Sequence, residues 1–99
     1  MIRYKIHAAA AEELKQALLY LAERSAQAAA SLVMDYEKAL RMVRTYPEGF
    51  ALERHGFRRH GLSRHPYSLV YSFEKGRIVI LAFMHQKRRP GYWASRSKK

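Results

Sequence analysis

The sequence predicts an α+β fold, in which a twisted, mainly antiparallel sheet carries a helical hairpin on one face. Three observations support this prediction. Helical periodicity fills most of the first half, two apolar strands follow each other in the second half, and Lys75-Gly76 between those strands suits a tight hairpin turn. The 99 residues are enough for one hydrophobic core, so we expect a single domain over residues 1–99.

The first half begins with the signals of a short strand and a helix. Residues 2–6 alternate between apolar and basic side chains, which is typical of a strand. From Ala8 the spacing becomes helical, with an apolar stripe at Leu14, Leu18 and Leu21. Glu12 and Glu13 are expected in the first turn of this helix, where the helix dipole favours acidic groups.

A second helix is expected directly after the first. Ser25 is suited to cap its N-terminus, and the helix should end before Pro47. Its predicted buried stripe consists of Ala29, Val33, Tyr36, Leu40 and Val43. The short turn makes the two helices an antiparallel hairpin. Their many alanines indicate close helix packing or, alternatively, a groove that accepts a partner helix.

The second half supplies most of the sheet. Residues 47–56 are expected to be a connector, and the predicted strands cover residues 58–62, 67–73 and 78–83. The last two strands are apolar on both faces, as central strands covered by helices are. The predicted element order is therefore β-α-α-β-β-β.

Composition argues against several classes of protein. There is no run of eighteen apolar residues, and charges interrupt the N-terminus where a signal peptide needs an apolar segment, so we expect a cytoplasmic protein without a membrane partner. The chain has no cysteine and therefore no disulfide. Its five histidines lack the spacing of a metal site, and no phosphate-binding loop is visible, so we expect no metal and no cofactor.

The positive charge is concentrated in the second half of the chain. Residues 1–49 contain seven Lys/Arg and six Asp/Glu, whereas residues 50–99 contain twelve and two. Such a basic half indicates a polyanionic partner, either a nucleic acid or an acidic protein segment. The alternative is a charged surface that only maintains solubility.

The most specific signal lies between Phe57 and Arg96, where two strands lead into a basic tail. The tail reads HQKRRPGYW from His85 to Trp93. Together with the Arg58-Arg59 pair and the PYSLVY strand over residues 66–71, it resembles the RelE/ParE superfamily of bacterial toxins. These are the toxic halves of type II toxin–antitoxin pairs, also called plasmid-stabilisation systems.

The resemblance implies a growth-arresting toxin that a mostly acidic antitoxin neutralises in a hetero-oligomer. Two activities occur on this fold, so fold alone does not decide between them. ParE-like members poison DNA gyrase, and RelE-like members cleave mRNA in the ribosome without a metal ion. Whether the chain is an enzyme therefore remains open. A third possibility is a non-toxic, basic nucleic-acid-binding module.

Four residues are candidates for catalysis if the chain is a ribonuclease. Metal-free RNA cleavage needs a base for the ribose 2′-hydroxyl, an acid for the leaving oxygen and cations around the phosphorane. By the resemblance, Arg59 and Arg88 match basic positions of RelE-like enzymes, and His85 and Tyr92 could serve as acid and base. The alternatives are a His85 that only bonds the backbone and a Tyr92 that packs the tail onto the sheet.

Two other positions depart from the RelE pattern and favour the ParE branch. Gly61 falls where RelE has a lysine, and Ser68 falls where it has the arginine that holds the phosphate. The candidate residues for binding the target or a nucleic acid are Arg58, Arg59, Arg64, Lys87, Arg88, Arg89 and Arg96. Of these, Arg59, Arg64 and Arg88 are expected to converge on the sheet face opposite the helices.

Overall fold

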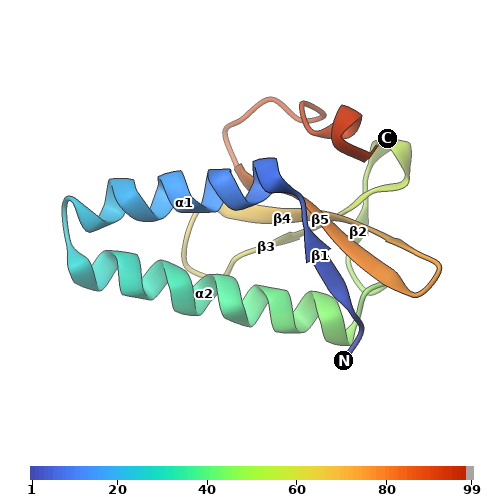
Figure 1. Ribbon diagram of the computed structural model, residues 1–99, viewed down its shortest axis with the longest axis horizontal. Coiled ribbons are helices and arrows are strands. Elements are labelled where there is room, and N and C mark those ends of the chain that lie inside the picture. Colours follow the sequence, from blue (N-terminus) through green and yellow to red (C-terminus); the bar gives the residue numbers. More distant parts are fainter. Residues whose placement is uncertain (98–99) are drawn as a thin grey trace.

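The computed structural model describes residues 1–97 as a helical hairpin packed on a five-stranded sheet (Figure 1). The elements in chain order are β1 (Tyr4–Ile6), α1 (Ala8–Ala22), α2 (Ala26–Thr45), β2 (Ala51–Leu52), the 3-10 turn η1 (Arg54–Gly56), β3 (Arg58–Gly61), β4 (Tyr67–Glu74), β5 (Arg77–His85) and the 3-10 turn η2 (Ala94–Ser97). The strand order is β1-β5-β4-β3-β2. β1 pairs with β5 in parallel and all other neighbours are antiparallel, which confirms the predicted fold class.

The predicted element order is confirmed, with one strand added. β2 lies inside the stretch expected to be a connector and pairs with β3 through Ala51 and Leu52. Two residues are too few to show the alternation that marks a strand in a sequence, so this strand is visible only through its pairing partner.

The helix boundaries agree with the sequence signals, including the start of α1 at Ala8. Ser25 caps α2 as predicted, because its Oγ accepts a hydrogen bond from the Ala28 N–H at 3.1 Å. At α1 the cap is His7, whose Nδ1 accepts from the Ala9 N–H at 3.0 Å. The expected place of Glu12 and Glu13 in the first turn is wrong, since the helix begins at Ala8 and no acid lies in that turn.

The buried stripe of α2 is rotated by about one residue from the predicted one. Leu40 and Val43 are buried as expected, but Val33 is 36% exposed and the neighbouring Leu32 is fully buried. In a helix, adjacent positions differ by about 100° around the axis, so the stripe can shift by one residue between two apolar neighbours. Leu32 and Val33 are both apolar, so the sequence does not decide which of them is buried, and in the folded protein it is Leu32.

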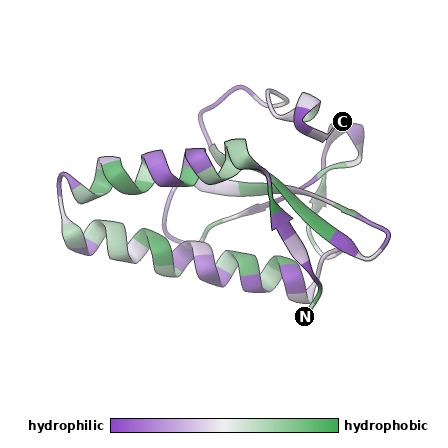
Figure 2. Ribbon diagram, in the orientation of Figure 1, coloured by the Kyte–Doolittle hydropathy of each residue, from purple (hydrophilic) through white to green (hydrophobic). Residues whose placement is uncertain are grey.

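Both faces of the sheet are covered, by different parts of the chain. On one face α1 and α2 bury Leu69, Tyr71 and Ile80, and the Tyr71 hydroxyl donates to the Pro47 carbonyl at 2.6 Å. Figure 2 shows β5, a central strand of the sheet, as largely hydrophobic. The second face carries a smaller core in which Phe57, Val70, Leu81, Ala82, Met84 and Trp93 pack together. We call this second face the tail face, because the C-terminal tail covers it.

The β4–β5 hairpin has the predicted turn. Lys75 and Gly76 both have positive φ angles, of 54° and 73°, which is the conformation of a type I′ turn. No helix within residues 1–97 is long and apolar enough to cross a membrane.

Candidate functional site

The tail that follows β5 turns back over the sheet and is anchored by Trp93. The Arg88 N–H donates to the His85 carbonyl at 2.9 Å, which reverses the chain directly after the strand. Trp93 is 3% exposed and meets Phe57 edge to face at 4.9 Å between ring centroids. Trp93 thus packs the tail onto the sheet, and the preceding basic residues 87–89 remain exposed.

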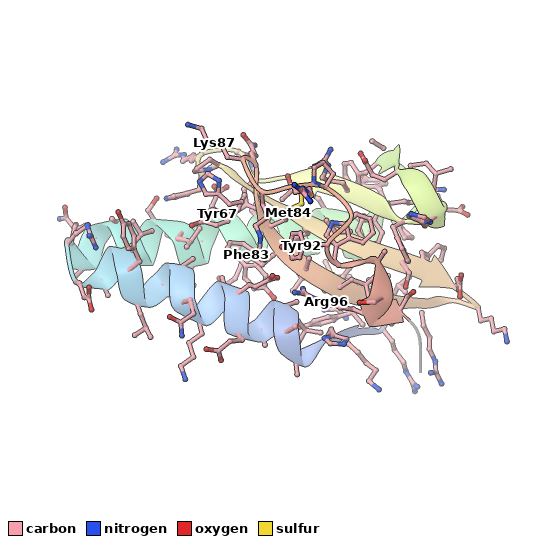
Figure 3. All side chains as sticks on the ribbon, turned by 90° about the horizontal axis from the view of Figure 1, so that it is seen from above. Tyr67, Phe83, Met84, Lys87, Tyr92 and Arg96 are labelled. Carbon is pink, nitrogen blue, oxygen red and sulfur yellow. The ribbon has the colours of Figure 1, made fainter. Side chains whose placement is uncertain are left out.

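An ion pair between Arg96 and Glu13 fastens the end of the tail to α1. Both Arg96 Nη atoms lie 3.0 Å from Glu13 carboxylate oxygens, and Nη1 also donates to the Leu81 carbonyl at 2.9 Å. The same carboxylate accepts the Phe83 N–H at 3.0 Å, so it joins α1, β5 and η2. Figure 3 shows Arg96 between η2 and the start of α1. The Arg96 guanidinium is therefore occupied inside the molecule, although the sequence suggested it for target binding.

Tyr92 lies between two arginines and has an unusual acidity. The Arg88 and Arg96 guanidinium carbons stand 3.9 and 5.0 Å from its ring centroid. Burial and the neighbouring Glu13 carboxylate raise the pKa of Tyr92 to about 12, even though the two cations act in the opposite direction. Within residues 1–97 its buried hydroxyl has no hydrogen-bond partner. Tyr92 is therefore neutral at physiological pH.

His85 has a backbone partner and a position beside a hollow. Its Nδ1 accepts the Lys87 N–H at 3.1 Å, and its ring meets Tyr67 edge to face at 5.1 Å. His85 and Arg88 share the lining of a hollow of about 390 Å³, together with residues of α1 such as Tyr20. The hydrogen bond to the backbone is the packing alternative considered for His85, and it occupies one of the two ring nitrogens.

The two positions that depart from the RelE pattern lie side by side on the tail face. Gly61 of β3 is paired in register with Ser68 of β4, and Ser68 in turn with Met84 of the smaller core. A Cβ added at Gly61 would meet the Ser68 Oγ at 3.7 Å. Neither residue carries a charge, so these two positions contribute no cation to the tail face.

The predicted arginine cluster is not observed, because its members lie in three separate environments. Arg59 faces the tail side and pairs with Glu53 at 3.3 Å. Arg64 lies in the β3–β4 loop, beside α2, and lines a hollow with Lys38. Arg88 projects from the tail with its side chain 56% exposed, 3.9 Å from Glu13. These three arginines were expected to converge on one face of the sheet, but the strand, the loop and the tail give each of them different neighbours.

The remaining predicted contact residues divide into engaged and exposed groups. Arg58 donates to the carbonyls of Glu48 and Phe50 at 3.3 and 2.9 Å, on the opposite face from Arg59. Lys87 and Arg89 are exposed beside Arg88. The exposed candidates on the tail are therefore three consecutive residues, 87–89. Among the residues described, no group of three His, Asp or Glu side chains is placed to hold a metal ion.

Sequence reasoning missed the residue that positions the β3–β4 loop. Asp35 of α2 is 6% exposed and accepts the N–H groups of Ser63, Arg64 and His65, while the His65 ring lies 2.9 Å from its carboxylate. Burial raises the pKa of Asp35, but these hydrogen bonds outweigh it and hold that pKa below its usual value. The available signal was an acid three residues after Leu32, on the apolar stripe of the helix.

Comparisons with known proteins match this architecture. A family model described as "ParE toxin of type II toxin-antitoxin system, parDE" matches residues 4–90. A solved structure of the chromosomal ParDE toxin–antitoxin system from P. aeruginosa superposes with a TM-score of 0.66 at 23% identity, covering 86% of this chain and 96% of that one. No curated protein gives a significant match. The match to the family model covers most of the chain, which therefore belongs to the ParE family of type II toxin–antitoxin toxins.

Proposed function

We propose that this toxin arrests growth in the cytoplasm by binding DNA gyrase, without catalysing a reaction itself, and that a cognate antitoxin with an acidic segment neutralises it. The ParE family match carries the toxin part of the proposal. The choice of gyrase over mRNA rests on the chemistry of the tail face.

The observation that carries this choice is the uncharged Gly61–Ser68 pair. The two residues are register partners. By the resemblance they match positions where a RelE-type nuclease needs cations around the phosphorane. Losing one such charge-assisted contact costs about 2–4 kcal/mol of transition-state stabilisation, by analogy with oxyanion donors. Two missing contacts would slow cleavage by several orders of magnitude.

Tyr92 gives independent support for a non-catalytic role. A pKa of about 12 makes the Tyr92 hydroxyl a weaker acid than an ordinary tyrosine, so it is less suited to protonate the leaving oxygen. The Oη atom is also buried. A substrate would have to displace the tail in order to reach it.

The proposed gyrase contact uses the exposed basic residues of the tail, Lys87, Arg88 and Arg89. They are consecutive and anchored on one side by β5 and on the other by Trp93. Of the other predicted contact residues, Arg64 is exposed at a different edge, while Arg58, Arg59 and Arg96 are engaged within the molecule.

The experiment is controlled induction in cells with thymidine and methionine incorporation followed in parallel, together with a supercoiling assay on purified DNA gyrase. The proposal requires DNA synthesis to fall first and supercoiling to be inhibited. Loss of protein synthesis before DNA synthesis would overturn the gyrase target. Harmless expression without an antitoxin would contradict the toxin function itself and favour a nucleic-acid-binding module.

A ribosome-dependent ribonuclease is the second candidate, and the shared hollow of His85 and Arg88 favours it. A histidine and an exposed arginine beside one hollow could act on a phosphate. Under this alternative Arg88→Ala should abolish toxicity, whereas the matched exposed variant Arg89→Ala should not. Under the gyrase proposal both variants weaken toxicity gradually, because protein interfaces distribute their energy over several contacts.

A further inference from the structure

A hollow with three cationic side chains lies between α2 and the β3–β4 loop, which runs beside that helix (Figure 1). Its volume is about 470 Å³, and it is lined by Lys38 and Arg41 of α2 and by Arg64 of the loop. We call it the α2 hollow. It shares no lining residue with the hollow beside His85 and Arg88, so it is distinct from the basic surface of the tail.

The three cations of the α2 hollow have no acidic partner within residues 1–97. All three residues are exposed, and none of them forms an ion pair. Glu37, one turn before Arg41 on the same helix, does not line the hollow. Like charges around one hollow repel each other, so an anion bound there would stabilise the folded protein.

Asp35 is the single acid among the described residues that line the hollow, and its carboxylate is already engaged. It accepts the N–H groups of Ser63, Arg64 and His65, and the residue is 6% exposed. A bound anion would therefore meet the three cations rather than this carboxylate. The same hydrogen bonds fix the backbone of Arg64 against α2, which keeps the loop cation near the helix cations before any ligand binds.

The spacing of the cations fits phosphate groups that follow one another along a chain. Lys38 and Arg41 are three residues apart and so lie on one side of the helix. Asp35, which holds the backbone of Arg64, is six residues before Arg41, or about 9 Å along the helix axis. Phosphates of one nucleic acid strand recur about every 3.4 Å along the duplex axis, so the cations span two or three of them.

The neutral lining residues suit phosphate groups as well. The hydroxyl-bearing Ser31 and Ser63 line the hollow and can donate to phosphate oxygens. No aromatic ring occurs among the described lining residues, so the hollow has no surface on which a base would stack. We propose that the α2 hollow binds adjacent phosphate groups, either along a nucleic acid strand or in a free diphosphate compound. The site does not depend on whether the toxin acts on gyrase.

The proposal is tested by NMR titration of isotope-labelled protein with pyrophosphate and, separately, with a six-nucleotide oligothymidine. Binding should shift the amide signals of residues 63–65 and the side-chain Nε–H signals of Arg41 and Arg64. Saturation at lower concentration by the oligonucleotide identifies a nucleic acid strand as the source of the phosphates, and the reverse order identifies a free diphosphate. Hexaglutamate, which carries carboxylates instead, should bind the hollow at least about tenfold more weakly.

Two double variants locate the site. Arg41→Gln with Arg64→Gln should weaken binding of both phosphate probes at least about tenfold, because two charge-assisted contacts are lost. For the oligonucleotide, the slope of log K against log salt should fall by about 1.4, since each phosphate contact of a single strand contributes about 0.7. Lys15→Gln with Lys75→Gln removes equal charge from exposed positions and should have a much smaller effect.

The substituted arginine side chains are exposed and hydrogen bond to no described residue, so thermal unfolding of that variant should match the wild type. Equal effects of the two double variants would overturn the proposal, because general charge attraction would then suffice. Equal binding of hexaglutamate, or unshifted signals of residues 63–65 at saturating phosphate probe, would overturn it as well.

Discussion

Substitution of Tyr92 is expected to have different effects on toxicity if the toxin binds gyrase and if it is a ribonuclease. Its buried hydroxyl has no partner among the described residues, and its pKa is raised to about 12. We expect Tyr92→Phe to keep toxicity unchanged and to alter the free energy of unfolding by about 0.5 kcal/mol or less, because no hydrogen bond is lost. Growth after induction and thermal unfolding measure the two effects. A loss of toxicity in a normally folded variant would favour the ribonuclease.

The raised pKa of Tyr92 also predicts how stability depends on alkaline pH. The unfolded chain loses this proton near pH 10, whereas the folded protein holds it until about pH 12. The stabilisation is therefore complete below pH 10 and is lost as pH rises from 10 towards 12. Denaturant unfolding at several pH values should show a shallower alkaline decline in the Tyr92→Phe variant. An identical decline in both proteins would contradict the assignment.

Asp35 is expected to contribute more to stability than any surface charge. Asp35→Ala would leave three backbone N–H groups of the β3–β4 loop without an acceptor, at a cost of about 2–4 kcal/mol. Chemical denaturation measures this loss, and the exposed acid in Glu37→Ala on the same helix is the control. Comparable effects of the two substitutions would show that Asp35 does not hold the loop.

The pH dependence of Asp35 has the opposite sign to that of Tyr92. Its pKa is lowered from 3.8 in the folded protein, because hydrogen bonds to the carboxylate outweigh the effect of burial. Its contribution is complete above about pH 4 and is lost as pH falls through the lowered value. Unfolding of the wild type should therefore become easier in that acidic range, and the Asp35→Asn variant should show a flatter acid profile.

At the scale of elements, the tail depends on the Glu13–Arg96 ion pair for its attachment to α1. Both side chains are 17% exposed, and each makes further hydrogen bonds to β5. Arg96→Ala should destabilise the protein by about 2 kcal/mol, since it leaves a partly buried carboxylate with fewer partners. The fluorescence of Trp93, the single tryptophan, reports release of the tail at lower denaturant. Arg89→Ala, in an exposed position, is the control and should leave both signals unchanged.

A substitution in the β4–β5 turn can test the effect of backbone conformation on stability without a change in packing. Gly76 has a φ of +73° and a Cβ there would touch nothing within 4 Å, so Gly76→Ala should cost about 1 kcal/mol through backbone strain alone. Gly61→Ala is the matched control, because its φ is not positive and its Cβ makes an ordinary contact with Ser68. Thermal unfolding of both variants measures the difference.

The elements with strong local signals were predictable, and those defined by distant partners were not. Ser25 and Pro47 marked the ends of α2, and Lys75-Gly76 marked the hairpin, because caps and turns are local chemistry. β2 exists only through β3, and the roles of Glu13 and Asp35 depend on Arg96 and on a loop 28 or more residues away. The periodicity of a sequence does not reveal contacts between distant residues. For the same reason, the expected convergence of Arg59, Arg64 and Arg88 was wrong.

At the scale of the whole molecule, the net charge of +11 affects the rate of association with a partner more than it affects the fold. The Lys and Arg side chains of the second half that the structure describes are divided between internal contacts and exposed surfaces. Arg58 forms a hydrogen bond within the molecule, and Arg59 and Arg96 form ion pairs. Residues 87–89 and Arg77, beside the β1 edge of the sheet, remain exposed. Two of the basic surfaces of the described residues therefore differ in backbone geometry, since one is a turn at the tail and the other an open strand at β1.

The last prediction concerns the rate at which the tail finds its target. If residues 87–89 contact gyrase, Lys87→Gln with Arg89→Gln should lower the association rate constant for purified gyrase by roughly three- to tenfold at low salt, and the difference should shrink as ionic strength rises. Lys15→Gln with Lys38→Gln removes the same charge from exposed positions on α1 and α2. Surface plasmon resonance measures both double variants. Because the net charge is equal in the two, an equal slowing would mean that overall charge, rather than the tail, guides the encounter.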